Sequence, residues 1–419
     1  MGLNELSHPE KIVVVGGGHA SAAAVVELRR LGFSGHVYMV SAEPVPPYDR
    51  TTLSKQVLLH GSPPPPLWPE LDAGIPGVDL RLGTYVLSVD PLSRALTTSD
   101  GDELVYDRLL IATGAEPRRI QLPGAAAEGV FYLRDHDDAR RLRARLAVCT
   151  RVVIIGGGVI GLEIAAAARG LGHEVTVVEA SRQVLGRSVP GPVASALVDL
   201  HREHGVGVHS GTTPTAIVTS GGSVRGVEVS DGSFIDADVV VVGIGVTPRE
   251  ALARDAGLSV ADGVLVDTQC RTSDPHIFAA GDVARVPAIS GKGTVRLEAW
   301  QPAWRQAQVA AAAMLGLPSV YHEQPWGWSD QYDAVVQTVG ICSPGADIVQ
   351  YGDVRAPGGL LALSFVDGEL VAAAGVSIGA AIGRPIRLVQ TLLDAGHHPL
   401  LDELRAERDL ASLTKYLKG

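Results

Sequence analysis

One glycine-rich segment occurs twice in this chain and limits its fold more than any other feature. KIVVVGGGHASAAAVVELRRLG begins at residue 11, and RVVIIGGGVIGLEIAAAARGLG begins at residue 151. Each copy has an apolar run of strand length, a glycine cluster, a helical pattern and a second apolar run that ends in an acid. Both copies therefore predict a βαβ unit, and the chain is expected to bind nucleotides at two places.

The first copy has the spacing of a dinucleotide-binding loop. Gly16 permits the tight turn out of the strand, Gly18 lets backbone amides approach a pyrophosphate, and Ser21 keeps strand and helix close. The helix N-terminus then faces the anion with free amides and the positive end of its dipole. Ser21 stands where the pattern has a third glycine. Glu43 is expected at the end of the second strand, where it can accept both hydroxyls of an adenosine ribose.

The second copy matches the full pattern with Gly156, Gly158 and Gly161, and its second strand ends in Glu179. A carboxylate at that place repels a 2′-phosphate and accepts a hydrogen bond from a free 2′-hydroxyl. NADH is therefore favoured over NADPH. Two arginines within residues 182–187 either soften that preference or are ordinary surface residues.

Chain length and charge fit an intracellular protein of several domains. The 419 residues are 46% hydrophobic, which at roughly 100–200 residues per domain predicts two or three cores. The net charge of −11, without a long basic tract, argues against a nucleic-acid partner, because binding phosphates needs clustered Lys and Arg. No stretch reaches the roughly 18 apolar residues of a membrane span, so no membrane association is expected.

The cysteines and the N-terminus point to a reducing compartment. Cys149, Cys270 and Cys342 lie far apart without CxxC spacing, which argues against a disulfide framework and against a redox-active dithiol. The first ten residues carry two Glu and no apolar leader. We expect a soluble, cytoplasmic protein with reduced thiols.

The segments that follow the second copy predict that the first domain is interrupted and resumes. VVVVGIGVTP and IFAAGDVARV are short apolar runs punctuated by Gly, Asp and Pro, and an Ala-rich helix closed by Gly316 follows them. The last part of the chain has the pattern of a small sheet with helices. We expect an α/β chain with two Rossmann-like dinucleotide-binding domains, residues 1–114 with 238–320 and residues 115–237, and a small C-terminal α+β domain of residues 321–419.

Six further motifs carry a specific resemblance. They are PYDRTTLSK (47–55), LLIATGAEPR (109–118), GIGVTP (243–248), AAGDV (279–283), WQPAWRQ (300–306) and WGWSDQ (326–331). In this order they resemble the FAD-dependent ferredoxin reductases of oxygenase systems, which include the biphenyl dioxygenase, putidaredoxin and rubredoxin reductases. The resemblance covers essentially the whole chain. It implies a glutathione-reductase-like architecture, with FAD in the interrupted domain and NADH in the second domain.

The resemblance places Arg50 and Lys55 against the FAD, with Lys55 beside the flavin ring. Reduction puts negative charge on the isoalloxazine, and a nearby ammonium stabilises it. The alternative for Lys55 is an ordinary solvated lysine. Glu163 is implied to face flavin and nicotinamide and to pair with Lys55; the alternative is an acid in the first helical turn that complements the helix dipole.

Four further residues are assigned to the cofactor by resemblance. Asp282 is implied to bind the ribityl hydroxyls, with a turn aspartate as the alternative. Arg134 matches an arginine near the cofactor, and a surface helix-cap arginine is the competing interpretation. Thr113 and Gly114 close the first domain where the chain crosses over, and a purely structural role is the alternative for both.

The remaining assignments concern the nicotinamide and the ring. Gly243 and Gly245 are implied to form a second glycine turn for the nicotinamide nucleotide, although Arg249 stands where the family often has Asn. The helix that begins near Trp300 is implied to point its N-terminus at the flavin's O2 side. Trp300 and Trp328 are candidates to line the isoalloxazine, with core packing as the alternative.

The function implied is hydride transfer from NADH to N5 of non-covalent FAD, followed by single-electron transfer to a small iron–sulfur ferredoxin. That ferredoxin serves an oxygenase, either a haem monooxygenase or a Rieske dioxygenase. Because ferredoxins are typically acidic, docking is expected to use a local basic patch, for which Arg296, Arg305 and Arg384 are candidates. Scattered solubilising arginines are the alternative.

Two other functions remain open on the residues alone. An NADH oxidase, peroxidase or disulfide reductase of the same superfamily needs a redox cysteine near the first domain's second strand, and residues 40–60 contain none. A binding protein similar to apoptosis-inducing factor, in which redox state governs association, is the third possibility. Neither the ferredoxin nor the oxygenase substrate can be named from the sequence.

Overall fold

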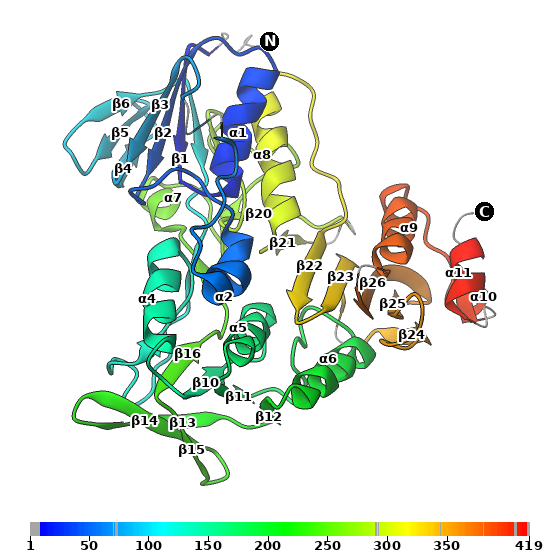
Figure 1. Ribbon diagram of the computed structural model, residues 1–419. Coiled ribbons are helices and arrows are strands. Elements are labelled where there is room, and N and C mark those ends of the chain that lie inside the picture. The colour runs from blue at the N-terminus through cyan, green and yellow to red at the C-terminus, as the bar shows by residue number, and fades with distance from the viewer. Residues whose placement is uncertain are drawn as a thin grey trace. The chain divides into compact units, whose positions relative to one another are not determined.

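The computed structural model divides the chain into two compact units (Figure 1). Unit 1 is Met1–Arg50, Pro65–Glu116 and Val246–Glu323, and unit 2 is Thr51–Pro64, Pro117–Gly245 and Gln324–Gly419. The structure describes residues 9–69, 71, 74–289, 291, 293–343, 345–379, 381–405 and 409–416. Each unit contains one copy of the repeat.

A five-stranded parallel sheet in the order β19-β7-β1-β2-β3 forms the centre of unit 1. The strands are β1 (Lys11–Val15), β2 (His36–Ser41), β3 (Val78–Leu82), β7 (Arg108–Ile111) and β19 (Ile277–Ala279). Ile12, Val13 and Val14 are fully buried because both faces of a parallel sheet are covered. Helices α1 (His19–Arg30) and α8 (Trp300–Met314) lie side by side (Figure 1).

Smaller elements complete unit 1. An antiparallel sheet contains β4 (Val86–Asp90), β5 (Ala95–Thr98) and β6 (Glu103–Val105), and a further sheet contains β18 (Val264–Leu265), β20 (Ala284–Pro287) and β21 (Thr294–Arg296). Short elements are α7 (Ala251–Asp255) and the paired strands β8 (Ala115–Pro117) and β17 (Val246–Pro248). The 3-10 turn η1 (Arg50–Thr52) and the end of β8 are places where the chain passes from unit 1 to unit 2. The predicted Ala-rich helix is α8, and it ends before Gly316 as expected.

Unit 2 repeats this plan with a parallel sheet in the order β12-β11-β10-β16-β9. The strands are β9 (Val130–Phe131), β10 (Arg151–Ile155), β11 (Glu174–Glu179), β12 (Gly207–Ser210) and β16 (Val239–Val242). Helices α4 (His136–Leu146), α5 (Val159–Gly170) and α6 (Gly191–Glu203) accompany it, with the antiparallel strands β13 (Pro214–Ser220), β14 (Ser223–Val229) and β15 (Phe234–Asp236). The predicted duplication of the βαβ unit is confirmed.

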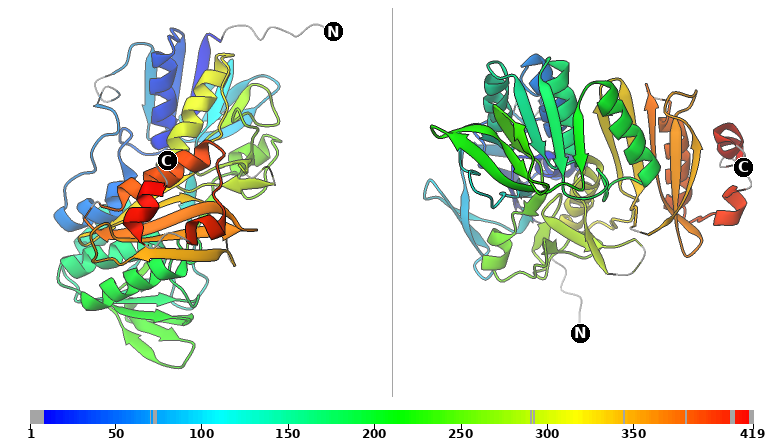
Figure 2. Two further views of the ribbon diagram at one scale, coloured as in Figure 1. Left: turned by 90° about the vertical axis from the view of Figure 1, so that its right-hand side faces the viewer. Right: turned by 90° about the horizontal axis from the view of Figure 1, so that it is seen from below.

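The last part of unit 2 is an antiparallel sheet in the order β22-β23-β26-β25-β24. Its strands are β22 (Trp326–Gln331), β23 (Ala334–Gly340), β24 (Asp347–Gly352), β25 (Leu360–Val366) and β26 (Glu369–Ile378), followed by α9 (Gly383–Asp394), α10 (Leu401–Arg405) and α11 (Leu410–Tyr416). Helix α6 packs against this sheet as well as against β12 (Figure 2). The predicted fold class is confirmed, and the predicted domain boundaries stay a prediction.

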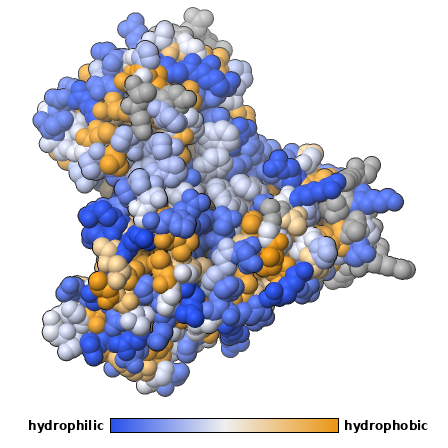
Figure 3. All heavy atoms as spheres, viewed as in Figure 1, coloured by the Kyte–Doolittle hydropathy of each residue, from blue (hydrophilic) through white to orange (hydrophobic). Residues whose placement is uncertain are grey.

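Hydrophobic side chains at the surface come from separate elements. On the face in Figure 3, hydrophobic patches alternate with hydrophilic residues, and Leu92, Val148 and Val320 are among the exposed large side chains. Within the described part of the chain, no helix is both long enough and apolar enough to cross a membrane.

Candidate functional site

The first glycine loop, between β1 and α1, has the geometry of an anion cradle. Gly16 has φ +138°, and a Cβ there would lie 2.2 Å from the carbonyl oxygen of Ala112. Gly18 is the N-cap of α1, and no side chain caps the helix there. The amides of the first turn are thus directed to a ligand rather than to a capping side chain. This loop fits a diphosphate, which needs close backbone approach and free amides.

Glu43 lies two residues beyond the end of β2, so its predicted position at the strand end is wrong. The strand ends at Ser41, whose Oγ accepts a hydrogen bond from the Glu43 N–H at 3.2 Å. This local bond turns the chain away from the ladder. The Glu43 carboxylate accepts a hydrogen bond from Tyr48 Oη at 2.6 Å and forms an ion pair with Arg50. Arg50 also lies over the Tyr48 ring, 4.9 Å from its centroid.

The second glycine loop, between β10 and α5, brings three predicted residues together. Gly156 has φ +110°, and a Cβ there would lie 2.4 Å from the carbonyl oxygen of Gly243. A Cβ on Gly161 would lie 2.1 Å from the Gly156 oxygen. Gly158 is the N-cap of α5, again without a capping side chain. The tight turn at Gly156 and the close packing at Gly161 agree with the sequence pattern, and nucleotide binding by this loop stays a prediction.

Glu179 is the last residue of β11, as predicted, and its carboxylate turns back onto the loop. One oxygen accepts a hydrogen bond from the Gly157 N–H at 2.7 Å, and the other accepts one from the Ser181 N–H at 2.7 Å. Each oxygen keeps a further lone pair for a ligand. The residue thus fits a ribose hydroxyl beside the glycine loop. Gly245, with φ +98°, lies near the Arg187 guanidinium.

Lys55 and Glu163 form the predicted ion pair inside unit 2. The Lys55 Nζ lies 3.3 Å from Glu163 Oε1 and 3.3 Å from Asp330 Oδ2. It also lies 5.6 Å from the centroid of the Trp328 ring. Lys55 belongs to a π-helical turn, η2 (Leu53–Val57), which continues into α2 (Leu58–His60). Its side chain is 15% exposed, so it is not an ordinary solvated lysine.

Glu163 is buried, with 4% of its side chain exposed, and is held by hydroxyl groups. Ser54 Oγ donates to one carboxylate oxygen, and Ser329 Oγ donates to the other at 2.6 Å. Burial raises the pKa of Glu163, whereas Lys55 and the two serines lower it. Glu163 is the fifth residue of α5, so it lies in the second turn and does not complement the helix dipole. The two serines lie within quoted motifs, but nothing in the sequence singled them out.

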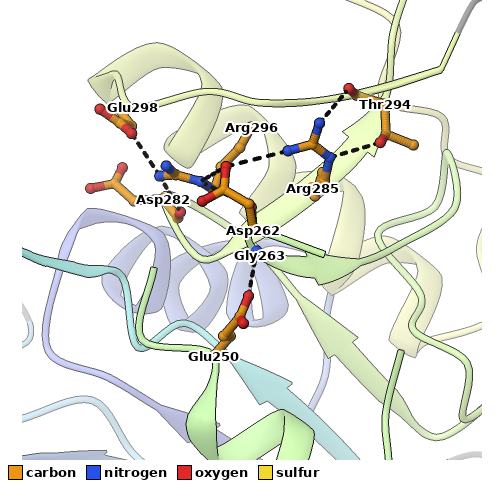
Figure 4. A network of polar contacts seen from close by, with 8 residues as sticks. All are labelled: Glu250, Asp262, Gly263, Asp282, Arg285, Thr294, Arg296 and Glu298. Carbon is orange, nitrogen blue, oxygen red and sulfur yellow. Dashed lines mark hydrogen bonds and ion pairs between the residues drawn. The ribbon is translucent and has the colours of Figure 1, made fainter. Parts of the chain in front are cut away.

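Asp282 follows β19 in the turn that the sequence predicted. A Cβ on its neighbour Gly281 would lie 3.1 Å from the Cβ of Ala20, so this turn meets the N-terminal end of α1. Arg296 Nη1 donates to the Asp282 carbonyl oxygen at 3.4 Å and pairs with Glu298 at 2.7 Å (Figure 4). Only 6% of the Arg296 side chain is exposed, so the expectation that it docks a partner is wrong.

Trp300 begins α8, as predicted, and lies beside the first glycine loop. Its ring and the His19 ring are perpendicular, with centroids 6.4 Å apart. His19 is the first residue of α1, and its Nε2 lies 3.3 Å from Asp49 Oδ1. Trp300 also packs against Trp304, with centroids 5.3 Å apart. Helices α1 and α8 therefore bring an aromatic pair to the predicted flavin side of unit 1.

Thr113, Gly114 and Arg134 each take part in a hydrogen bond that involves the backbone. Thr113 Oγ1 donates to the Arg249 carbonyl oxygen at 2.8 Å, and the Arg249 N–H donates to the Gly114 oxygen at 2.9 Å. The Arg134 N–H donates to Asp138 Oδ2 at 3.0 Å just before α4. Within the described ranges, no cluster of His, Cys, Asp or Glu could hold a metal ion.

The predicted residues divide between the two units. Gly16, Gly18, Ser21, Glu43, Arg50, Thr113, Gly114, Asp282 and Trp300 belong to unit 1. Lys55, Arg134, Gly156, Gly158, Gly161, Glu163, Glu179, Gly243, Gly245 and Trp328 belong to unit 2. One unit therefore carries the first glycine loop with its acid, and the other carries the second loop with the Lys55–Glu163 pair.

Comparisons with known proteins agree with this geometry. Residues 10–308 match the family model of pyridine nucleotide-disulphide oxidoreductases, and residues 326–414 match the model named reductase C-terminal. The ferredoxin–NAD(+) reductase component of the anthranilate 1,2-dioxygenase system from Burkholderia cepacia is 41% identical, over 91% of this chain and 94% of its own length.

Two solved structures are similar over most of the chain. The ferredoxin reductase for the CYP199A2 system from Rhodopseudomonas palustris has a TM-score of 0.91 and is 35% identical, covering 97% of this chain and 100% of its own. Putidaredoxin reductase in its covalent complex with putidaredoxin has a TM-score of 0.85 and is 32% identical, covering 91% and 93%.

Proposed function

Because this chain belongs to the pyridine nucleotide-disulphide oxidoreductase family, we propose that it is an NADH-dependent, FAD-containing ferredoxin reductase. It passes electrons from NADH through FAD to a small iron–sulfur ferredoxin that serves an oxygenase. The duplicated glycine loop is the observation that carries this proposal, since two uncapped helix N-termini provide for two dinucleotides. The names of the anthranilate dioxygenase component and of the putidaredoxin complex support the choice of electron acceptor.

Unit 1 supplies most of the proposed FAD site. The loop from Gly16 to Gly18 would hold the diphosphate, and Glu43, fixed by Tyr48 and Arg50, would hold the adenosine ribose. Asp282 would bind the ribityl chain, and Trp300 would line the isoalloxazine ring. Thr113, Gly114 and Arg134 are the other residues proposed to contact FAD. When bound, FAD accepts a hydride from NADH and releases electrons singly. We propose an FAD-binding domain of residues 1–114 with 238–320, of which residues 238–245 lie in unit 2, where β16 pairs with β10.

The second loop would hold NADH, in a domain of residues 115–237, with residues 321–419 as the C-terminal domain. Gly156, Gly158 and Gly161 provide the diphosphate cradle, and Gly243 with Gly245 lines the turn beside it. The Glu179 carboxylate is oriented by two backbone N–H groups, so its charge stays at the ribose position. It favours NADH because it repels the additional phosphate of NADPH.

Lys55 would bring a positive charge to the flavin ring, where reduction adds negative charge. Glu163 and Asp330 each lie 3.3 Å from its ammonium and hold it in place. The Trp328 ring of β22 lies 5.6 Å from it, and the Lys55 side chain is only 15% exposed. The chain would thus contribute the fixed positive charge of the largely buried Lys55 side chain, and no residue needs to act as a nucleophile.

The cysteines give no support to disulfide chemistry. Cys149, Cys270 and Cys342 are all free. Cys270 is fully buried, and burial raises the pKa of its thiol, so it is a poor nucleophile. Three unpaired thiols are typical of a reducing compartment, and we assign the protein to the cytoplasm.

The test is to purify the protein, record its flavin spectrum and mix it anaerobically with NADH. We expect a bound flavin that NADH bleaches rapidly, and reoxidation by a two-iron ferredoxin. The Lys55→Gln variant should bind FAD but be reduced at least tenfold more slowly, the size of one well-placed charge. A protein that takes up no FAD, or a flavin that NADH leaves oxidised, would contradict the proposal.

Electrostatic docking of the ferredoxin is tested by salt. Raising the salt concentration should weaken ferredoxin-dependent turnover and spare the reduction of ferricyanide, because screening acts on the charged protein partner. Of the predicted docking arginines, Arg384 is exposed, whereas Arg305 is paired with Glu323. Arg384→Gln should therefore reduce the salt dependence of ferredoxin-dependent turnover more than Arg305→Gln does. If salt affects turnover with the ferredoxin and with ferricyanide equally, electrostatic docking is refuted.

A further inference from the structure

A line of hydrogen-bonded side chains leads from Glu163 through three buried polar residues to the half-buried Tyr332. Ser329 and Gln331 alternate along β22, so both lie on the same face of the strand. Gln331 Nε2 donates to Ser329 Oγ at 3.1 Å. The Gln331 Oε1 atom lies 2.8 Å from Nε2 of His201, a fully buried residue of α6. His201 Nδ1 in turn lies 2.9 Å from Tyr332 Oη.

The charge on Glu163 fixes the direction of every bond in this line. An ionised carboxylate only accepts, so Ser329 must donate its single hydroxyl hydrogen to Glu163. Ser329 Oγ then accepts from the Gln331 amide, which turns Oε1 toward His201 and makes His201 Nε2 the donor. His201 Nδ1 is then the acceptor for the Tyr332 hydroxyl in the neutral ring. Five side chains are thus ordered in one direction, and all donation ends on one carboxylate.

We propose that His201, acting through Gln331 and Ser329, is a positioning residue that keeps Glu163 ionised and oriented beneath Lys55. This inference rests on the proposed function, because the Lys55–Glu163 pair matters to the flavin only in a reductase. It goes beyond that function in assigning a role to α6 and to the buried face of β22. Aligned hydrogen bonds polarise one another, so a donor several bonds away strengthens the last bond to the carboxylate.

The surroundings of Glu163 are consistent with this role. Burial raises its pKa, and the hydroxyl of Ser329 is one of the groups that oppose the rise. The charged groups beside it are Lys55 from η2 and, beyond Lys55, Asp330 from β22. Removing the support of Gln331 weakens the Ser329 bond, so the carboxyl should take up a proton at higher pH.

A second interpretation is that His201 and Gln331 only fasten α6 to the C-terminal sheet. The chain offers a matched control, since Arg355, which follows β24, forms an ion pair with Glu203 of α6. That pair joins the same helix to the same sheet, but both side chains are more than half exposed and do not reach Glu163. Arg355→Gln should therefore lower stability slightly and leave the titration of Glu163 unchanged.

The test is an infrared titration of the protonated carboxyl band between about pH 5 and pH 9, a range that includes buried glutamates with raised pKa. The band of Glu163 is identified by its loss in Glu163→Gln. Ser329→Ala and Gln331→Met should each move its midpoint to higher pH, the first more than the second. In a Ser329→Ala background, Gln331→Met should have no further effect, because its path to Glu163 is already broken.

His201→Phe tests the part of the line beyond Gln331. If the His201→Phe variant does not fold, Tyr332→Phe is used in its place. Either variant should raise the titration midpoint of Glu163 by less than Gln331→Met does. In Gln331→Met, NADH should reduce the flavin about fivefold more slowly with an unchanged KM for NADH, as expected for one weakened hydrogen bond. An unmoved midpoint in Gln331→Met, or additive shifts in the double variant, would overturn the inference. The infrared readout does not require NADH, so failure of the proposed function gives a separate result.

Discussion

The two glycine loops share one backbone plan and differ in the side chains that complete it. In both, the amide of the first glycine, Gly16 or Gly156, donates to a carbonyl of the neighbouring strand at 2.8 Å, and the helix begins three residues later. Glu179 ends its strand and returns to its loop, whereas Ser41 holds that place in the first copy and the acid follows at Glu43. The duplicated backbone fixes where a dinucleotide lies, and the side chain at the strand end sets which ribose contact is available.

The third position of the helix shows a second difference. Gly161 leaves no room for a side chain, since a Cβ would meet the Gly156 oxygen at 2.1 Å. Ser21 holds the corresponding position in α1, fully buried, and its Oγ would lie 2.7 Å from a Cβ on Gly16. The first loop thus accommodates a side chain that the second excludes. The serine in place of the third glycine is therefore a difference in packing between the two loops.

The largest expected effect is that of Gly161→Ala. Its Cβ would collide with backbone rather than with a flexible side chain, so the helix must shift at a cost of about 3 kcal/mol. NADH binding should weaken at least tenfold while FAD is retained, because the first loop is unchanged. Urea unfolding and NADH titration of the flavin measure the two effects. Wild-type NADH affinity in this variant would show that the two loops tolerate side chains equally.

Replacing each acid by glutamine should distinguish the ribose contact of NADH from that of FAD. Glu179→Gln removes the charge that repels a 2′-phosphate, and the ratio of kcat/KM for NADH over NADPH should fall about tenfold. Glu43→Gln should leave that ratio unchanged and instead weaken FAD retention during dialysis, since it loosens the contact with Arg50. If Glu43→Gln changes the nucleotide preference, the assignment of the two loops is reversed.

The sequence predicted what depends on local pattern and missed what depends on distant contacts. Both βαβ units, the tight turns and the acid at the end of β11 were predicted, because each follows from a short periodic segment. The position of Glu43 was missed because one hydroxyl of Ser41 ends the strand early. Ser54 and Ser329 reach Glu163 across 109 and 166 residues of chain, a distance that no spacing pattern covers. Burial of Arg296 was likewise invisible.

A second pair of acids, Asp107 and Asp238, lies at the opposite end of the two parallel sheets from the glycine loops. Asp107 accepts hydrogen bonds from the backbone N–H groups of Glu10 and Lys11, and Asp238 accepts the equivalent bonds from Thr150 and Arg151. Only Asp238 has the additional Arg151 guanidinium, at 2.9 Å, among the contacts the structure gives for the two. Its bonds to Arg151 lower the pKa of Asp238 to about 2.

Asp238→Asn should therefore destabilise the protein more than Asp107→Asn, by about 1 kcal/mol at pH 7 after allowance for partial exposure. A carboxyl whose pKa is depressed on folding stabilises above its unfolded pKa, near 4, and loses that contribution as the pH falls toward 2. The difference between the variants should thus shrink between pH 4 and pH 2 in urea unfolding. A difference independent of pH would mean that the ion pair is not its source.

The smallest expected effect returns to Ser21, where the first loop departs from the second. Its Oγ is buried, and the described residues give it no hydrogen-bond partner, which costs free energy in the folded state. Ser21→Ala keeps the Cβ that this loop accommodates and removes the unpaired hydroxyl, so stability should rise by up to about 1 kcal/mol with FAD affinity unchanged. Gly161→Ala is the matched comparison, because it places the same alanine at the corresponding position of α5, where stability should fall rather than rise. A loss of FAD in Ser21→Ala would mean that the hydroxyl is satisfied by the bound diphosphate, and that the first copy uses a side chain where the second uses only backbone.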